Sequence, residues 1–130
     1  MVTRKLRIIV AEDEAIIALA IQYELEARGH KVALARDGQD ALEVAEQLGT
    51  FDALVTDMQM PRMRGDQLVQ RLRLTHPNLP IVVVSANVCA KTVNTLQALP
   101  GLLSVLTKPF PFDLLANEVE RLAAICLCEQ

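Results

Sequence analysis

The chain has 130 residues and a mass of 14.3 kDa, a size that fits one domain and leaves no room for a second enzymatic module. Hydrophobic residues make up 52% and charged residues 22%, which indicates a folded globular domain rather than a disordered chain. A net charge of -3 and a pI near 5.3 argue against direct binding to nucleic acid, because such binding needs a concentrated Lys and Arg surface. We therefore expect a single domain over residues 1–130.

No segment predicts a membrane span or a secretory signal. The longest apolar stretches, residues 16–21 and 122–128, fall well short of the ~20 residues that cross a bilayer, and the first apolar run soon meets an acidic segment. The cysteines are odd in number and lack C-x-x-C spacing, which argues against a disulfide framework and against a zinc site. They are Cys89, Cys126 and Cys128. We expect reduced thiols, a cytoplasmic location and no membrane partner.

In chain order, the first strand is expected over residues 7–10, and the first helix over residues 15–28, where Gly29 ends it. One face of this helix carries the apolar residues Ile16, Ala20, Tyr23 and Ala27. A second strand over residues 32–34 leads to a helix that Asp37 can cap at its start. The apolar period of the second helix falls on Ala41, Leu42, Ala45 and Leu48.

The second helix ends at Gly49, and a third strand is expected over residues 53–55. Pro61 and Gly65 then break the chain into a loop before a third helix, which ends at His76 because a proline follows it. The apolar residues of this helix are Leu68, Val69 and Leu72.

The last part of the chain repeats the pattern twice more. A fourth strand is expected over residues 81–84, followed by a weaker helix with Val93 and Leu96 that ends at Pro100. The fifth strand covers about residues 102–106. The final helix places Leu115, Val119, Leu122 and Cys126 on one stripe.

Five strands that alternate with five helices are typical of a parallel sheet. The first, third and fourth strands are almost wholly apolar, as expected for strands that helices cover on both faces. We predict an α/β fold, doubly wound and flavodoxin-like, of (βα)5 type, with a five-stranded parallel sheet of order 2-1-3-4-5. In this order the winding direction reverses between strands 1 and 3, and ligands bind beyond the carboxyl ends of the strands at that point.

Four of the five expected strands end in reactive or charged side chains. In chain order these are Glu12 with Asp13, then Asp57, Ser85 and Lys108. Three carboxylates brought to one edge of a sheet repel one another unless a cation neutralises them. Because the available ligands are hard oxygens and no His or Cys lies nearby in the sequence, Mg²⁺ is favoured over zinc or copper.

The other two side chains at these strand ends suit a phosphoryl group. Lys108 adds a compact positive charge, and Ser85 adds a hydroxyl donor. Around Asp57, these groups and a metal ion would form a site for a tetrahedral anion. An aspartate can accept a phosphoryl group as an acyl phosphate, which makes Asp57 a candidate nucleophile.

Four segments carry these residues in order: IIVAEDE, LVTDMQMPRMRGDQL, VVVSAN and LTKPF. In the second segment Pro61 follows Asp57 by four residues and Gly65 follows it by eight. With these four segments the chain resembles the response-regulator receiver domains of bacterial two-component signalling, of the chemotaxis-regulator type. Each segment alone is a weak signal, whereas four in this order are specific, and the resemblance covers essentially the whole chain.

The resemblance implies a Mg²⁺ site at the strand ends. Asp13 would bind the ion directly, and Glu12 would act mainly through a metal-bound water. Asp57 and the backbone carbonyl of Gln59 would complete the protein ligands.

The resemblance also implies how phosphoryl transfer would proceed. Asp57 would take the phosphoryl group from a histidine kinase or a histidine phosphotransfer protein. Lys108 would pair with the Asp57 carboxylate and then with the phosphoryl group, to which Ser85 would donate a hydrogen bond. The Lys108–Pro109 peptide bond is often cis in this family. The chain would be a switch that catalyses only its own phosphorylation and dephosphorylation, with a protein as its downstream target.

One position departs from the family pattern. Receivers usually carry Tyr or Phe three residues before the lysine, as an aromatic side chain that reports phosphorylation, and here that residue is Val105. A β-branched side chain has restricted χ1 freedom, so we expect signal transmission chiefly through the backbone of residues 86–92. His30 and His76 lie beside Gly29 and Pro77, and both are expected at the surface and not as phosphodonors.

Two other functions compete with the receiver interpretation. A Mg²⁺-dependent phosphohydrolase similar to the haloacid dehalogenases needs a second Asp two residues after the nucleophile, and Gln59 at that position argues against it. A degenerate receiver that serves only as a protein scaffold is disfavoured by the retained site residues, although Val105 keeps it open. Uptake of phosphate or beryllofluoride with Mg²⁺ would discriminate between a phosphoacceptor and a scaffold.

Overall fold

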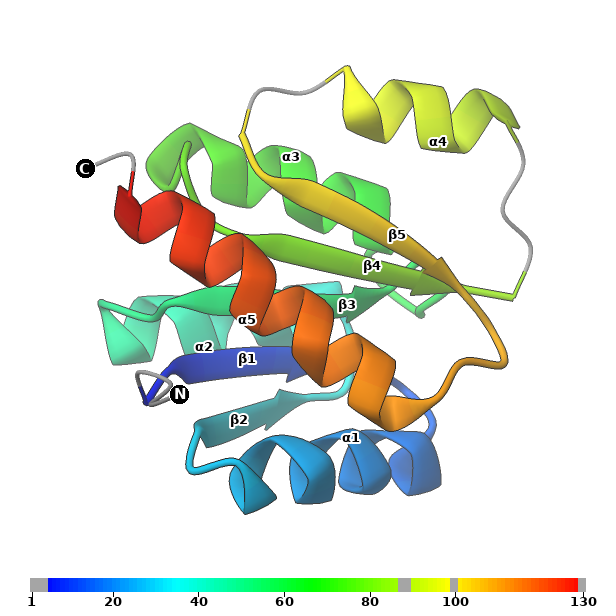
Figure 1. Ribbon diagram of the computed structural model, residues 1–130. Coiled ribbons are helices and arrows are strands. Elements are labelled where there is room, and N and C mark those ends of the chain that lie inside the picture. The colour runs from blue at the N-terminus through cyan, green and yellow to red at the C-terminus, as the bar shows by residue number, and fades with distance from the viewer. Residues whose placement is uncertain (1–4, 87–89, 99–100, 129–130) are drawn as a thin grey trace.

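A computed structural model describes residues 5–86, 90–98 and 101–128 of the chain. Its strands are β1 (Arg7–Ala11), β2 (Lys31–Ala35), β3 (Ala53–Asp57), β4 (Ile81–Ser85) and β5 (Leu103–Thr107). Its helices are α1 (Ala15–Ala27), α2 (Gly38–Leu48), α3 (Gly65–Thr75), α4 (Ala90–Gln97) and α5 (Phe112–Cys128). The strands form one parallel sheet of order β2-β1-β3-β4-β5, which confirms the predicted fold and strand order (Figure 1).

Helices cover both faces of this sheet. α1 and α5 lie on one face, whereas α2, α3 and α4 lie on the other (Figure 1). Successive side chains of a strand point to opposite faces, so Ile8 and Val10 of β1 pack under α1 and α5, while Ile9 packs toward α2 and α3. Every residue of β3 and β4 is buried, and before their polar ends, Thr56, Asp57 and Ser85, these central strands are apolar without alternation, as the sequence predicted.

The apolar face predicted for α1 points to solvent. Ile16 is 84% exposed and Tyr23 is 79% exposed, whereas the buried side chains are those of Ala18, Ile21 and Leu25. This helix is apolar on almost every side, so periodicity alone could not identify its inner face. Packing against β1 and α5 selects the face that is buried.

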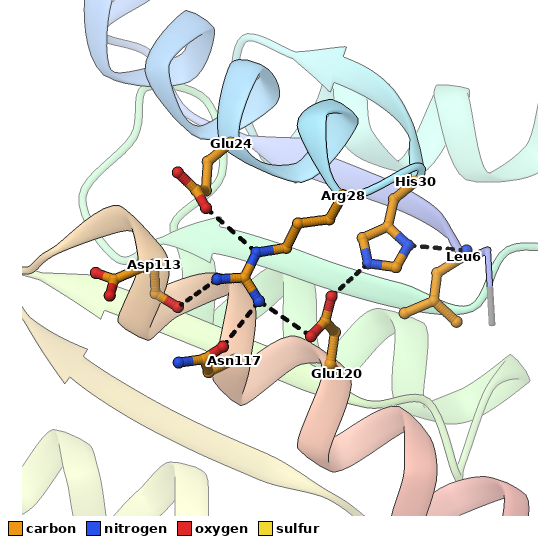
Figure 2. A network of polar contacts seen from close by, with 7 residues as sticks. All are labelled: Leu6, Glu24, Arg28, His30, Asp113, Asn117 and Glu120. Atoms are coloured by element: carbon orange, nitrogen blue, oxygen red, sulfur yellow. Dashed lines mark hydrogen bonds and ion pairs between the residues drawn. The ribbon is translucent and has the colours of Figure 1, made fainter. Parts of the chain in front are cut away.

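His30 is buried, which corrects the expectation that it lies at the surface. Its Nδ1 accepts a hydrogen bond from the Leu6 backbone N–H at 3.1 Å, and its Nε2 lies 2.8 Å from Glu120 Oε2 of α5 (Figure 2). A ring nitrogen that accepts from a backbone N–H is unprotonated, so these partners assign the proton to Nε2, which donates to Glu120. His30 therefore connects the residue directly before β1 to α5.

Arg28, at the end of α1, reinforces this connection (Figure 2). Its Nη1 lies 2.8 Å from Asn117 Oδ1 and 3.1 Å from Glu120 Oε1, and its Nε lies 3.2 Å from Glu24 Oε2. Its Nη2 donates to the Asp113 carbonyl at 3.4 Å. One guanidinium thus joins α1 to the first three turns of α5.

A second arginine, Arg73 of α3, is buried at the opposite edge of the sheet from the carboxyl ends of the strands. Its Nη1 donates to the carbonyls of Pro77 at 3.3 Å and of Leu79, and its Nη2 donates to the Leu102 carbonyl at 2.7 Å. The side chain therefore links the end of α3 to the entrances of β4 and β5.

Cys126 is half-buried on α5, and its Sγ donates to the Asn78 carbonyl at 3.3 Å. Cys89 lies outside the described residues, and so does the side chain of Cys128. Within the described parts of the chain, no helix has both the length and the apolar character that a membrane span requires.

Candidate functional site

The candidate site is formed where the carboxyl ends of β1, β3, β4 and β5 meet. Parallel pairing places Asp57 opposite Val84, and Ser85 opposite Thr107, so the segments that leave these strands emerge side by side. The backbone N–H of Lys108 donates to the Ser85 carbonyl at 2.8 Å, which extends the pairing of β4 and β5 by one residue. The register of the sheet therefore brings together residues from distant parts of the sequence.

Four carboxylates form a cluster at this edge. One oxygen from each of Glu12, Asp13, Glu14 and Asp57 lies within 4.8 Å of the others. Glu12 and Asp57 are buried, with exposed fractions of 3% and 4%, whereas Asp13 and Glu14 are exposed. The cluster thus has a buried inner half and an outer half open to solvent.

Lys108 supplies the positive charge that faces this cluster. Its Nζ lies 3.0 Å from Asp57 Oδ2, 3.4 Å from Glu12 Oε1 and 3.7 Å from Glu14 Oε1. Burial alone would lower the pKa of Lys108, but the hydrogen bond to Asp57 and the charges of Asp57 and Glu12 outweigh it and raise the pKa. The lysine is therefore held in its charged form against the aspartate.

Glu12 is the least satisfied group of the site. Its Oε2 accepts a hydrogen bond from the Glu14 N–H at 3.1 Å, but its buried Oε1 has no hydrogen-bond partner among the described residues, despite the nearby ammonium. Burial, together with the charge of Asp57, raises the pKa of Glu12 to about 7.

This arrangement fits a divalent cation. Four clustered carboxylates face one ammonium, and one buried carboxylate oxygen, Glu12 Oε1, lacks a hydrogen-bond partner among the described residues. The donor atoms are all oxygens, which suit Mg²⁺ and not the softer metals.

The loop after β3 contributes backbone groups to the site. The N–H of Gln59 donates to Asp57 Oδ1 at 3.3 Å, and the N–H of Gly65 donates to the Met58 carbonyl at 2.9 Å. A Cβ atom at Gly65 would overlap with the carbonyl oxygen of Asp57, so only glycine lets α3 begin this close to the end of β3.

The remaining predicted residues occupy the expected places. Ser85 is buried at the end of β4, and the Lys108–Pro109 peptide bond is cis, as the resemblance led us to expect. Val105 is half-buried in β5 and packs against the core on the face of the sheet that α2, α3 and α4 cover.

Two features were missed from the sequence. Glu14 joins the acidic cluster, and its position directly after Glu12 and Asp13 was the signal that could have included it. Arg62 forms a bidentate ion pair with Asp37, whose carboxylate also caps α2 through the Asp40 N–H. Nothing in the spacing of these residues indicated that pair.

The sheet order defines a flavodoxin-like domain, and the acidic cluster at its carboxyl edge is a candidate ligand site at the switch point. Residues 8–120 match the family model described as the response regulator receiver domain. The chain therefore belongs to the receiver domains of two-component response regulators.

Individual relatives agree with this family. A response regulator receiver protein of Anaeromyxobacter sp. (strain Fw109-5) is 38% identical over 103 residues, which cover 79% of this chain and 42% of that protein. The sensor kinase CckA of Brucella abortus is 34% identical over 116 residues, or 88% of this chain and 12% of the kinase. The structure of a Francisella response regulator receiver domain superposes with a TM-score of 0.81 at 30% identity, covering 93% of this chain and 98% of the other.

The chain spans less than half the length of these two curated relatives. In the sensor kinase the similar segment is one part of a much longer protein.

Proposed function

We propose that Asp57 is the phosphoacceptor of this receiver domain. The observation that carries the proposal is the position of Lys108 Nζ, 3.0 Å from the buried Asp57 carboxylate and inside a cluster of four carboxylates. Before phosphorylation, the Lys108 ammonium neutralises the charge of the Asp57 carboxylate. Once Asp57 is phosphorylated, the ammonium can move to a phosphoryl oxygen.

Mg²⁺ is the metal that we propose for the site. Asp13 and Asp57 would bind it directly, Glu12 would act through a metal-bound water, and Gln59 would supply its backbone carbonyl. When bound, the ion supplies positive charge that offsets the carboxylates and the phosphoryl oxygens.

The transfer itself is a displacement at phosphorus. A carboxylate oxygen of Asp57 forms the new O–P bond as the P–N bond of a donor phosphohistidine breaks, and the electron pair of that bond stays on the imidazole. Lys108 stabilises the charge on the phosphoryl oxygens, and Ser85 donates a hydrogen bond to one of them. Other side chains need not form covalent bonds, because the reaction depends mainly on the positions of the reacting groups and on neutralising their charge.

The partners follow from this chemistry. The donor is a histidine kinase or a histidine phosphotransfer protein, and the phosphorylated form is read by a downstream protein. We propose that residues 1–130 form a single receiver domain and that it acts as a switch in the cytoplasm. It catalyses only its own phosphorylation and dephosphorylation.

The decisive experiment replaces the nucleophile. Asp57→Asn removes the attacking oxyanion and keeps nearly the same shape, so it is expected to abolish Mg²⁺-dependent uptake of phosphate from a small-molecule phosphodonor while the fold persists. Circular dichroism checks the fold, and hydroxylamine sensitivity of the incorporated phosphate checks the acyl phosphate.

Glu14→Gln serves as the matched control, because Glu14 belongs to the same cluster but is exposed and carries no proposed role in the transfer. Hydroxylamine-sensitive phosphate on the Asp57→Asn variant would refute the assignment of the nucleophile. Failure of the wild-type protein to accept phosphate or beryllofluoride would favour a scaffold role instead.

A further inference from the structure

The loop of residues 58–64 between β3 and α3 is fastened to the start of α2 by an ion pair. Arg62 Nε lies 2.8 Å from Asp37 Oδ2, and Arg62 Nη2 lies 3.1 Å from Asp37 Oδ1. The Asp37 carboxylate is itself fixed, because it is buried and its Oδ1 accepts the Asp40 N–H at 2.8 Å as the cap of α2. The guanidinium therefore binds an acceptor that the helix already holds in place.

The backbone of Arg62 adds a second observation. Its φ of 65° lies in the left-handed region, which glycine adopts without steric cost and other residues rarely adopt. At this φ an arginine has a strained backbone, whereas a glycine would not. The ion pair with Asp37 offsets the energetic cost of this strain.

The same loop also lies in close contact with its neighbours. A Cβ atom on Gly38, which follows Asp37, would lie 2.7 Å from both the Cβ and the carbonyl oxygen of Met63. At the far end of the loop, a Cβ atom on Gly65 would overlap with the carbonyl oxygen of Asp57. The loop thus has little free space on the side of α2 or on the side of β3.

Gln59 connects this loop to the site. It lies three residues before Arg62, and its N–H donates to Asp57 Oδ1 at 3.3 Å. A shift of the loop would therefore move the backbone of Gln59 relative to the carboxylate of Asp57.

We propose that Arg62 is a positioning residue, which pairs with Asp37 to hold the loop so that the backbone of Gln59 is preorganised beside Asp57 for a divalent cation. The inference rests on the proposed function of Asp57 and deepens it, because it assigns a residue outside the acidic cluster to the same cation site.

The proposal predicts a loss of cation affinity without a loss of the chemical step. Residues that orient metal ligands from outside the ligand set typically change affinity by ~10- to 100-fold, and we expect the low end for Arg62→Gly, because the glycine fits the backbone. Arg62→Lys keeps the charge but cannot form two parallel bonds, so it should restore only part of the affinity. Phosphorylation at saturating Mg²⁺ should stay within about twofold of the wild-type rate.

The experiment is a Mg²⁺ titration of the purified domain, followed by the NMR amide signals of Asp13 and Gln59. Arg36→Ala is the matched control, because it removes a positive charge from the residue next to Asp37 in the sequence, while the Arg36 side chain is 87% exposed and its Nε lies 3.9 Å from Asp40. Asp37→Asn removes the charge that pairs with Arg62 but keeps the helix cap, because Asn also caps helices, so it should weaken Mg²⁺ binding. The double variant Asp37→Asn with Arg62→Gly should bind Mg²⁺ no more weakly than Arg62→Gly alone.

Amide hydrogen exchange of residues 58–64 without Mg²⁺ separates this inference from the proposed function. Faster exchange in Arg62→Gly than in Arg36→Ala, together with weaker Mg²⁺ binding, supports the positioning role. Unchanged exchange, or Mg²⁺ affinity equal to that of the wild type, overturns it. If the wild-type protein bound no Mg²⁺, the proposed function would fail, and the exchange rates would still decide whether Arg62 orders the loop.

Discussion

Glu12 combines burial with a position beside another carboxylate, and its pKa is raised to about 7 from the usual 4.5. The folded state therefore favours the protonated carboxyl, whereas the unfolded chain releases that proton at lower pH. Without Mg²⁺, the free energy of unfolding should fall as the pH rises from about 4.5 to about 7 and then level off. Glu12→Gln, which cannot ionise, should lose this decline.

Urea unfolding at about pH 5 and about pH 8, with a chelator present, measures the effect. Glu14→Gln is the control, because this neighbouring carboxylate is exposed and lies outside the buried half of the cluster. Equal pH dependence in the wild type and in Glu12→Gln would show that the Glu12 carboxyl does not carry the effect.

Asp13 and Ser85 have different roles in the proposed site, and a metal titration can distinguish them. Asp13→Ala removes a ligand and should weaken Mg²⁺ binding by at least about tenfold. Ser85→Ala should change it by less than about twofold, because the hydroxyl is proposed to touch only the phosphoryl group. Equal losses in a calorimetric titration would contradict this division of roles.

Most residues of the candidate site could be predicted because the sheet register determines where they lie. Glu12 and Lys108 each directly follow a strand and Asp57 is the last residue of one, and parallel strands bring their carboxyl ends to one edge. Arg62 could not be predicted, because its pairing with Asp37 depends on a left-handed residue in an irregular loop. Local sequence does not determine that conformation.

At the scale of elements, the types and order of the helices and strands followed from apolar periodicity, but the orientation of α1 did not. The exposed Ile16 and Leu19 are as apolar as the buried Ile21 and Leu25, so periodicity alone could not indicate which face of α1 is buried. For the amphipathic helix α3, the same reasoning succeeded, and the predicted residues Leu68 and Leu72 are buried. Periodicity identifies a face only where polar residues mark the opposite one.

The buried connection between His30 and Glu120 predicts a measurable contribution to stability. His30→Ala leaves the Leu6 N–H and the Glu120 carboxylate without their buried partner, and it should lower the free energy of unfolding by roughly 2–4 kcal/mol. Glu120→Gln retains an oxygen that can accept from Nε2 and should cost only about 1 kcal/mol. Urea unfolding at neutral pH measures both changes.

Tyr23→Ala on the exposed face of α1 is the control and should stay within about 0.5 kcal/mol of the wild type. A His30→Ala variant as stable as this control would show that the connection between β1 and α5 contributes nothing to the fold.

At the scale of the whole molecule, Val105 limits how a signal can leave the site. This side chain is half-buried and β-branched, so it cannot move between buried and exposed positions as an aromatic ring would. We expect beryllofluoride to shift NMR signals of residues 86–92, part of which lies outside the described residues, with Val105 as passive packing.

Val105→Ala tests this expectation. If Val105 is passive, the variant should accept beryllofluoride and show the same pattern of shifts over α4, β5 and α5 as the wild type. Normal phosphorylation combined with loss of the shifts on those elements would make Val105 an active relay.

The guanidinium of Arg73 fixes one end of the molecule. It joins the end of α3 to the entrances of β4 and β5, at the edge of the sheet opposite Asp57 and Lys108. To separate these segments would leave a buried charge without its acceptors, which is costly. Displacements that begin at the edge of the sheet with Asp57 should therefore act as rotations about a fixed end, with their largest amplitude near Asp57 and little movement where the strands begin.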